Sequence, residues 1–322
     1  MRRVGRYVGG VVVIGLLVGG GYVAVQQGLG PLPDPDRCTA TADGYTVEIS
    51  PEQAENASII AAVAERRGLP ARAISIAIAT AFQESKLQNL DSGDRDSLGL
   101  FQQRPSQGWG TPKQIMDPFY SANAFYDALV KVDGFEDMPI TEAAQRVQRS
   151  AFPNAYADHE RDGRTIASAM AGYSQAAFTC TTDTPDLSGQ DMTSSGLTPR
   201  AEVVRRDVEK AFGTMSLGGF APGGVDSGHM NGSAHYDGRA IDVFFRPISP
   251  ENTRRGWVLA HYLVANAARL DVAHVIFDGK IWTAGDTSDQ GWRVYTPKAA
   301  GDVSPATKAI LLHRDHVHVD VF

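Results

Sequence analysis

Hydrophobic positions divide the sequence into an apolar N-terminal run, a helical first half and a second half that mixes helices with strands. Residues 7–25 contain no charged side chain and approach the roughly 20 residues that a membrane-spanning helix needs. Arg2, Arg3 and Arg6 precede this run, so the rest of the chain is expected outside the cytoplasm. The pattern predicts an uncleaved transmembrane anchor within residues 1–30, with a cleaved signal peptide as the alternative.

Residues 50–180 have the pattern of a mainly helical domain. Ser50 and Gln53 fit a capping box around Pro51, which predicts a helix start. Residues 71–84 carry isoleucines at alternate positions, as a strand would, but their alanines and their length favour a buried helix.

Residues 198–322 combine helical and strand patterns. Helices are expected to begin at Pro199 and Pro250, each of which follows a Ser or Thr N-cap. The Asp-Gly pair at 278–279 lies between two apolar segments and predicts a β-hairpin. With a final strand at 316–322, the pattern predicts an α+β domain with a small antiparallel sheet.

Two irregular stretches separate these parts of the chain. Residues 31–49 begin with several prolines and predict a stiff spacer, whereas residues 181–197 are rich in Ser, Thr, Asp and Gly and predict a linker. The 322 residues are therefore expected to form two domains, 50–180 and 198–322, behind the N-terminal helix.

Composition limits the classes of partner. The hydrophobic content of 43% is typical of globular proteins, and the net charge of −7 without a downstream basic run argues against nucleic acid. Cys38 and Cys180 are the two cysteines and bracket the helical domain. An oxidising compartment would allow them to form a disulfide, and two unpaired buried thiols are the alternative.

Glu84 is the first candidate catalytic residue. In the helix predicted at 71–84 it shares a face with Ala77, Thr80 and Ala81, which are small and mostly apolar. A partly desolvated carboxyl group holds a proton more readily near neutrality, as a general acid for a glycosidic bond must. Most glutamates near a helix end are simply solvated, so this position alone does not establish catalysis.

The sequence around Glu84 adds a family resemblance. Glu84 and Ser85, followed by Gly-Leu-Phe-Gln at 99–102, resemble the motifs of the lysozyme-like lytic transglycosylases. The resemblance implies that Glu84 protonates the leaving oxygen of the glycosidic bond. The residues that it places along the sugar groove are Ser97, Gly99 and Gln102.

Two departures from that family leave the reaction open. The family's Ala-Tyr-Asn-Ala-Gly motif is absent, and residues 150–156 occupy that region. The intervening loop offers Asp91, Asp94 and Asp96, none of which is clearly a second catalytic carboxylate. Hydrolysis and intramolecular transglycosylation therefore both remain open, and a lone acid/base glutamate suits the second.

A second group of candidate residues lies in the C-terminal half. Asp242 belongs to a predicted strand at 240–245, where a buried carboxylate needs a partner such as a metal ion. His316 and His318 are two residues apart on the last strand and share a face, while His235 lies in a loop just before the first strand. Two histidines and one aspartate, with an open fourth position, are a ligand set of catalytic zinc.

Neighbouring residues are less certain. Strand alternation turns Asp315 away from His318, so Asp315 reaches the site only if the strand begins after it. The other histidines are expected to be structural, with His229 the least certain because it lies in a glycine-rich segment before the motif. They are His159, His229, His261, His274 and His313.

The pattern Ser-x-His-x-x-Gly-x-Ala-x-Asp at 233–242, with Asp-x-x-His at 315–318, is specific. It resembles the zinc D-Ala-D-Ala carboxypeptidases and phage L-alanyl-D-glutamate endopeptidases of the lysostaphin/sonic-hedgehog superfamily. The zinc ligands that this resemblance implies are His235, Asp242 and His318.

The same resemblance implies further roles. Asp315 would be the general base that acts on a zinc-activated water, and His316 would steady the oxyanion. Ser233 would belong to the substrate site. The arginine that holds a substrate carboxylate has two candidates, Arg239 and Arg246.

Both resemblances lead to peptidoglycan, with one module cutting glycan strands and the other cutting stem peptides or crosslinks. We therefore expect a bifunctional, membrane-anchored, extracytoplasmic peptidoglycan hydrolase that uses Zn²⁺. The alternative is a non-catalytic wall-binding or scaffold protein that retains both folds. A transporter component is excluded because a single spanning segment is expected.

Overall fold

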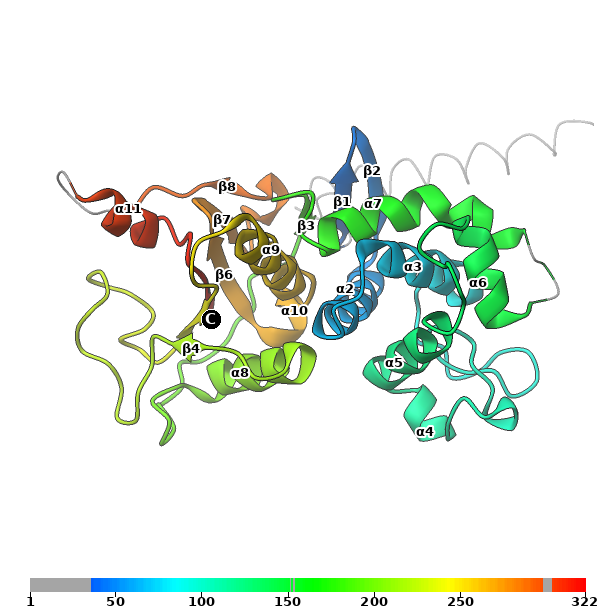
Figure 1. Ribbon diagram of the computed structural model, residues 1–322. Helices are drawn as coiled ribbons and strands as arrows, with labels where there is room; N and C mark the ends of the chain where they lie inside the picture. Colours follow the sequence, from blue (N-terminus) through cyan, green and yellow to red (C-terminus); the bar gives the residue numbers. More distant parts are fainter. Residues whose placement is uncertain (1–35, 151, 153, 298–302) are drawn as a thin grey trace, which may run out of the picture. The chain divides into compact units, whose positions relative to one another are not determined.

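The structure, a computed structural model, describes residues 36–150, 152, 154–297 and 303–322. This part of the chain contains ten α-helices and two antiparallel sheets (Figure 1). Residues Asp36–Phe322 form one compact unit, and buried apolar side chains from both halves belong to one core. The division into domains on either side of residues 181–197 stays a prediction.

The first helices follow the pattern of the sequence. Helix α2 (Pro51–Arg66) begins with the predicted capping box, in which Ser50 Oγ accepts from Gln53 N and Gln53 Oε1 accepts from Ser50 N. Helix α3 (Ala71–Ser85) is buried along most of its length, which explains why its isoleucines follow no single face. The other helices of this half are η1 (Pro105–Gln107), α4 (Pro112–Ile115), α5 (Pro118–Leu129), α6 (Ile140–Gln148), η2 (Ala155–His159) and α7 (Glu160–Met170).

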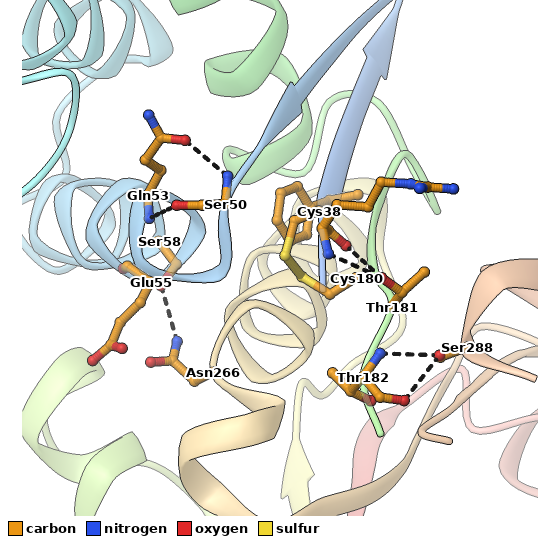
Figure 2. Close-up of a disulfide and its surroundings, with 12 residues drawn as sticks. Cys38, Ser50, Gln53, Glu55, Ser58, Cys180, Thr181, Thr182, Asn266 and Ser288 are labelled. Atoms are coloured by element: carbon orange, nitrogen blue, oxygen red, sulfur yellow. Dashed lines mark hydrogen bonds between the residues drawn. A yellow bond between two sulfur atoms is a disulfide. The ribbon is translucent and has the colours of Figure 1, made fainter. Parts of the chain in front are cut away.

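A three-stranded sheet joins the two ends of this half. Strand β1 (Cys38–Ala42) lies between β2 (Tyr45–Ile49) and β3 (Phe178–Cys180), and both pairings are antiparallel. Cys38 and Cys180 are register partners and form a disulfide across 142 residues of sequence (Figure 2). The predicted pairing of the cysteines is therefore present in the structure.

The second half is built on a six-stranded antiparallel sheet with the order β4-β5-β9-β6-β7-β8. The predicted hairpin is confirmed as the β6–β7 pair. The C-terminal strand β9 lies between β5 and β6, in the middle of the sheet. The strands are β4 (Leu217–Gly218), β5 (Ala240–Phe244), β6 (Val272–Phe277), β7 (Lys280–Thr283), β8 (Arg293–Val294) and β9 (His316–Val321).

The predicted helix starts at Pro199 and Pro250 are confirmed. The helix that begins at Pro250 is interrupted at Asn266, where α9 ends and α10 starts. Asn266 Nδ2 also donates to Ser58 Oγ over 2.9 Å, so this break contacts helix α2 (Figure 2). The helices of this half are α8 (Pro199–Phe212), α9 (Pro250–Ala265), α10 (Ala267–Leu270), η3 (Ser288–Gln290) and α11 (Pro305–Leu311).

Further contacts join the two halves. The carboxylate of Glu65 on α2 accepts from Arg254 and Arg255 on α9. Residue Thr182, in the stretch predicted to be a linker, is 9% exposed, and its N–H donates to Ser288 Oγ (Figure 2). These contacts are consistent with a single compact unit.

The predicted fold class is wrong in two respects. It has one small sheet, whereas the described residues form two. Strands β1 and β2 form a hairpin around Asp43 and Gly44, both at positive φ, and this local Asp-Gly signal was missed within the stretch predicted to be a spacer. Strand β3 joins β1 from more than 130 residues away along the chain, a pairing without a local signal. It also includes an N-terminal transmembrane helix, and the segment 7–25 on which that prediction falls lies outside the described residues. Among the helices that are described, none has both the length and the apolar character needed to cross a bilayer, so the structure gives this helix no support.

Candidate functional site

The central strand pair brings two of the predicted zinc ligands together. Asp242 on β5 and His318 on β9 are register partners, so their side chains leave the same face of the sheet. Asp242 Oδ1 lies 3.1 Å from His318 Nδ1. Both side chains are buried, at 6% and 7% exposed.

His235 completes this group from a loop outside the sheet. Its Nε2 lies 3.0 Å from His318 Nδ1 and 3.2 Å from Asp242 Oδ1. The other nitrogen of its ring, Nδ1, donates to the carbonyl of Gly219 over 2.8 Å. Gly219 has a φ of +80°, and a Cβ there would lie 2.3 Å from His235 Cε1, so only glycine allows this close contact.

The backbone around His235 folds into consecutive turns. Gly238 N donates to the His235 carbonyl and Arg239 N donates to the Ala234 carbonyl. Ser233 Oγ accepts from His235 N at 3.4 Å. Ser233, predicted to contact substrate, thus has a contact that orients the histidine, and its substrate role stays a prediction.

These three residues, called here the metal triad (His235, Asp242 and His318), fit a zinc ion. Their three facing atoms are 3.0–3.2 Å apart. Ligand atoms at a tetrahedral zinc with bonds near 2.0–2.1 Å are separated by about 3.3 Å. Three acceptor atoms this close repel one another unless a proton or a cation lies between them, so the donor set suits a divalent metal.

The titration of the triad reflects this crowding. Burial disfavours the charged form of Asp242, but hydrogen bonds to His235 and His318 prevail and hold the pKa of Asp242 well below its usual range. Burial also disfavours the His318 imidazolium, yet its contacts with Asp242 and Asp320 raise the pKa of His318 to about 9. The site therefore attracts positive charge.

A second layer of hydrogen bonds orients His318. Its Nε2 lies 3.2 Å from Asp320 Oδ2, and the other oxygen of Asp320 lies 2.8 Å from His274 Nδ1. Because the carboxylate accepts from Nε2, a neutral, metal-binding ring would carry its proton there, with the Nδ1 lone pair facing the triad. Asp320 was not among the site residues predicted from the sequence, although the alternation of β9 places it on the same face as His316 and His318.

Asp315 lies just before β9, which begins at His316. This is the condition under which the sequence allowed Asp315 to reach the site, and its side chain is 5% exposed. Asp315 Oδ1 is 2.8 Å from His316 Nδ1, and Oδ2 is 2.6 Å from Arg246 Nη2. Burial opposes ionisation of Asp315, but the contacts with His316 and Arg246 lower its pKa overall.

His316 faces the triad with its other nitrogen. His316 Nε2 lies 3.8 Å from Asp242 Oδ1, and its side chain is largely buried. Of the two candidate arginines, Arg239 is engaged by the carbonyl of Val321 and by Asp237. Arg246 is 55% exposed at its side chain and is bound to Asp315.

His229, predicted from the sequence to be a structural histidine, also lies near the triad. Its ring stacks on that of His235, with centroids 3.9 Å apart. Ligand atoms of His229, His235 and Asp242 lie within 4.8 Å of one another, so these residues also form a group that could hold a metal. Burial and the nearby His235 lower the pKa of His229.

Glu84 lies in the last turn of α3, where the structure gives it a partner. Tyr156 donates its hydroxyl hydrogen to Glu84 Oε1 over 2.6 Å. Burial and this contact with Glu84 raise the pKa of Tyr156, which keeps its hydroxyl protonated. Tyr156 falls in the segment 150–156, which stands where the family motif was missing.

The loop after Glu84 is joined to the same helix end. Ser85 Oγ lies 2.7 Å from the carbonyl of Leu100 and 3.0 Å from that of Ala81. Gly99 has a φ of +74°, and a Cβ there would lie 2.8 Å from the Ile115 carbonyl. Gln102 Nε2 donates to the Gly99 carbonyl, which keeps the predicted groove residues in one tight turn.

The loop carboxylates differ in their contacts. Asp96 accepts from Arg104 Nε and from the N–H of Ser106 at 2.7 and 2.8 Å. The Ser106 and Arg104 contacts lower the pKa of Asp96, so this carboxylate serves the loop itself. Asp91 and Asp94 are exposed, and neither contacts Glu84 among the described residues.

Comparison with known families gives one partial match. A family model described as VldE, C-terminal domain, matches residues 193–307. The matched segment includes His229, His235 and Asp242 but ends before β9, which carries His318. None of the curated proteins matches the chain.

Proposed function

We propose that this protein is a peptidoglycan hydrolase with a zinc peptidase site in its second half and a glycan-cleaving site around Glu84. The triangle of His235 Nε2, Asp242 Oδ1 and His318 Nδ1, with sides of 3.0–3.2 Å, carries the proposal. This geometry supports a peptidase centre because three protein ligands leave a fourth position for water.

Zinc bound to the triad would polarise the scissile amide and activate water for attack. Asp315 is the proposed acceptor of the water proton, and His316 is the proposed donor to the developing oxyanion. Their mutual hydrogen bond of 2.8 Å supports this pairing, because each orients the other.

Arg246 is the better candidate for binding a substrate carboxylate. Its guanidinium is half exposed and holds Asp315, whereas Arg239 is committed to Val321 and Asp237. A substrate carboxylate would compete with Asp315 for Arg246. Binding of substrate would thereby free the proposed base, whose pKa the arginine lowers.

The glycan-cleaving half of the proposal is supported by the Tyr156–Glu84 hydrogen bond and by the Ser85–Leu100 contact. The first orients the carboxyl group, and the second joins the acid to the loop of the proposed sugar groove. In the proposal Glu84 donates its proton to the glycosidic oxygen and afterwards accepts one.

An extracytoplasmic location is part of the proposal. The disulfide between Cys38 and Cys180 supports it, because such bonds persist in oxidising compartments.

The test is mass spectrometry of soluble products released from purified cell walls by wild-type protein, His318→Ala and Glu84→Gln. We expect wild type to release fragments cut in both glycan and peptide. His318→Ala should lose the peptide cuts alone and Glu84→Gln the glycan cuts alone. Unchanged products from either variant would contradict the matching half of the proposal.

A non-catalytic wall-binding or scaffold protein remains the second candidate. The engagement of both Asp315 oxygens by His316 and Arg246 favours it, because a fully paired carboxylate is a poor base. This candidate predicts that wild-type protein sediments with purified walls and releases no soluble fragment.

A further inference from the structure

His229 approaches the metal triad from a glycine-rich segment, residues 219–232. Its imidazole stacks on His235 at an interplanar angle of 21°. One of its ring nitrogens lies within 4.8 Å of a ring nitrogen of His235 and of a carboxylate oxygen of Asp242. A further ligand atom therefore lies beside the His235 and Asp242 members of the triad.

The Tyr236 side chain holds His229 in this position through two hydrogen bonds to the His229 backbone. The Tyr236 hydroxyl accepts from His229 N at 3.1 Å and donates to the His229 carbonyl at 2.5 Å. Tyr236 directly follows His235, so the residue that places His229 belongs to the same turn as a triad ligand. These two hydrogen bonds fix the backbone of His229, which would not be needed if its side chain only covered the loop surface.

The segment itself leaves room for movement. Gly228 and Gly232 have positive φ, and a Cβ at either position would meet nothing within 4 Å. Among the residues that the structure describes, none forms a hydrogen bond with a ring nitrogen of His229. The His229 imidazole can therefore bind a metal ion, and it can move away from the triad without breaking a hydrogen bond of its ring.

We propose that His229 supplies a fourth protein ligand, a ring nitrogen, to the metal held by the triad. It would thereby close the coordination position that a catalytic zinc leaves open to water. This inference rests on the proposed zinc centre and adds its regulation.

The distances agree with a small closing movement. Ligand atoms around a tetrahedral zinc lie about 3.3 Å apart, whereas the His229 group lies within 4.8 Å, so a movement of about 1.5 Å or less per atom pair would bring it to that separation. Four protein ligands characterise closed zinc sites, whereas catalytic sites keep one position for water. The protein with His229 bound is a latent peptidase, and lifting of residues 219–232 opens it.

The test uses the full chain with Co²⁺ as the metal probe, because the visible absorption of Co²⁺ reports its coordination. Azide serves as the second probe, since it binds a metal that has an open or water-filled position. The variants are His229→Ala, Tyr236→Phe and, as a control in the same loop, Ser227→Ala. Chelator competition measures zinc affinity for each.

We expect azide to leave the Co²⁺ absorption spectra of wild type and Ser227→Ala unchanged. The His229→Ala spectrum should respond to azide, and its zinc affinity should fall about tenfold or more. Tyr236→Phe should give a partial azide response, because it frees the backbone of His229 and keeps the ligand. An equal azide response and equal zinc affinity in wild type and His229→Ala would overturn the role of His229 and leave the triad intact. Failure of the wild type to bind Co²⁺ or Zn²⁺ would overturn the metal centre itself.

Discussion

Asp242 and His318 come from strands that are 76 residues apart in the chain, and they face each other as register partners with Oδ1 and Nδ1 separated by 3.1 Å. The sheet makes this contact, because β9 pairs with β5 along five residue pairs. Their separation is close to the roughly 3.3 Å between two ligand atoms of a tetrahedral zinc ion. The chemistry proposed for the second half depends on this pair and on His235 beside it.

Loss of one triad ligand should abolish metal binding. His318→Ala and Asp242→Asn each remove one of the three proposed zinc ligands. Mutating a residue that only hydrogen-bonds a ligand typically costs about 10–100-fold in metal affinity, so we expect a larger loss of zinc affinity here. Metal analysis after dialysis should give about one zinc per wild-type chain and almost none for either variant. The control is His159→Gln in the first half, which should keep its zinc. Undiminished zinc in His318→Ala would refute the assignment.

Asp320 should act on zinc through His318. Asp320→Asn weakens the hydrogen bond that keeps the proton on His318 Nε2, so we expect about 10–100-fold weaker zinc binding. His274 contacts the other oxygen of Asp320, so His274→Gln should also weaken zinc binding, but by less. Competitive titration with a chromogenic chelator measures both. Equal affinities for wild type and Asp320→Asn would show that the carboxylate does not orient the ligand.

Arg246 should affect substrate binding more than turnover. Arg246→Ala removes the proposed partner of a substrate carboxylate, so KM for stem peptides with a free C-terminus should rise about tenfold or more. Peptides with an amidated C-terminus should show little change between wild type and variant. Arg239→Ala is the matched control, and it should leave this discrimination intact. Steady-state kinetics with the two peptide series decides the point, and a pure kcat effect would contradict it.

Glu84→Gln should remove glycan cleavage with little loss of stability. A glutamine at this position still accepts the hydrogen bond from Tyr156, but it cannot donate a proton to the glycosidic oxygen. We expect the rate to fall by about 10²–10⁴-fold, with Tyr156→Phe intermediate between wild type and Glu84→Gln. Release of soluble muropeptides measures the rate. Asp94→Asn changes an exposed acid in the neighbouring loop and should behave like wild type; an equal loss in that variant would point to general damage.

Acid should destabilise the fold through His261. Complete burial lowers the pKa of His261 to about 4 from its ordinary value of 6.5, although Nδ1 donates to the Ala169 carbonyl. The unfolded chain therefore binds more protons between these values, and the free energy of unfolding falls as pH decreases from 6.5 to 4. This one group accounts for roughly 2–3 kcal/mol between pH 7 and pH 4.5.

His261→Gln tests that contribution, because glutamine keeps a donor for Ala169 and does not titrate. Urea unfolding at pH 7 and pH 4.5 should give a smaller difference for the variant than for wild type. The same pH dependence in both proteins would show that His261 does not carry the acid sensitivity.

Local patterns in the sequence determined the helix starts and the hairpin. Ser50 and Gln53 form the predicted capping box, and the Asp-Gly pair at 278–279 forms the turn between β6 and β7. These features depend on neighbouring residues, whose preferences the sequence expresses directly. The motif at 233–242 likewise named two members of the triad before any distance was known.

Tertiary structure decided which distant residues meet. Strand β9 lies between β5 and β6, and β3 completes a sheet with β1, although neither pairing has a local signal. The packing of η2 on α3 likewise brings Tyr156 to Glu84. By contrast, the alternation of β9 alone places Asp320 on the same face as His318. Hydrophobic periodicity shows which face of an element is buried, but the partner that covers it depends on the packing of the whole chain.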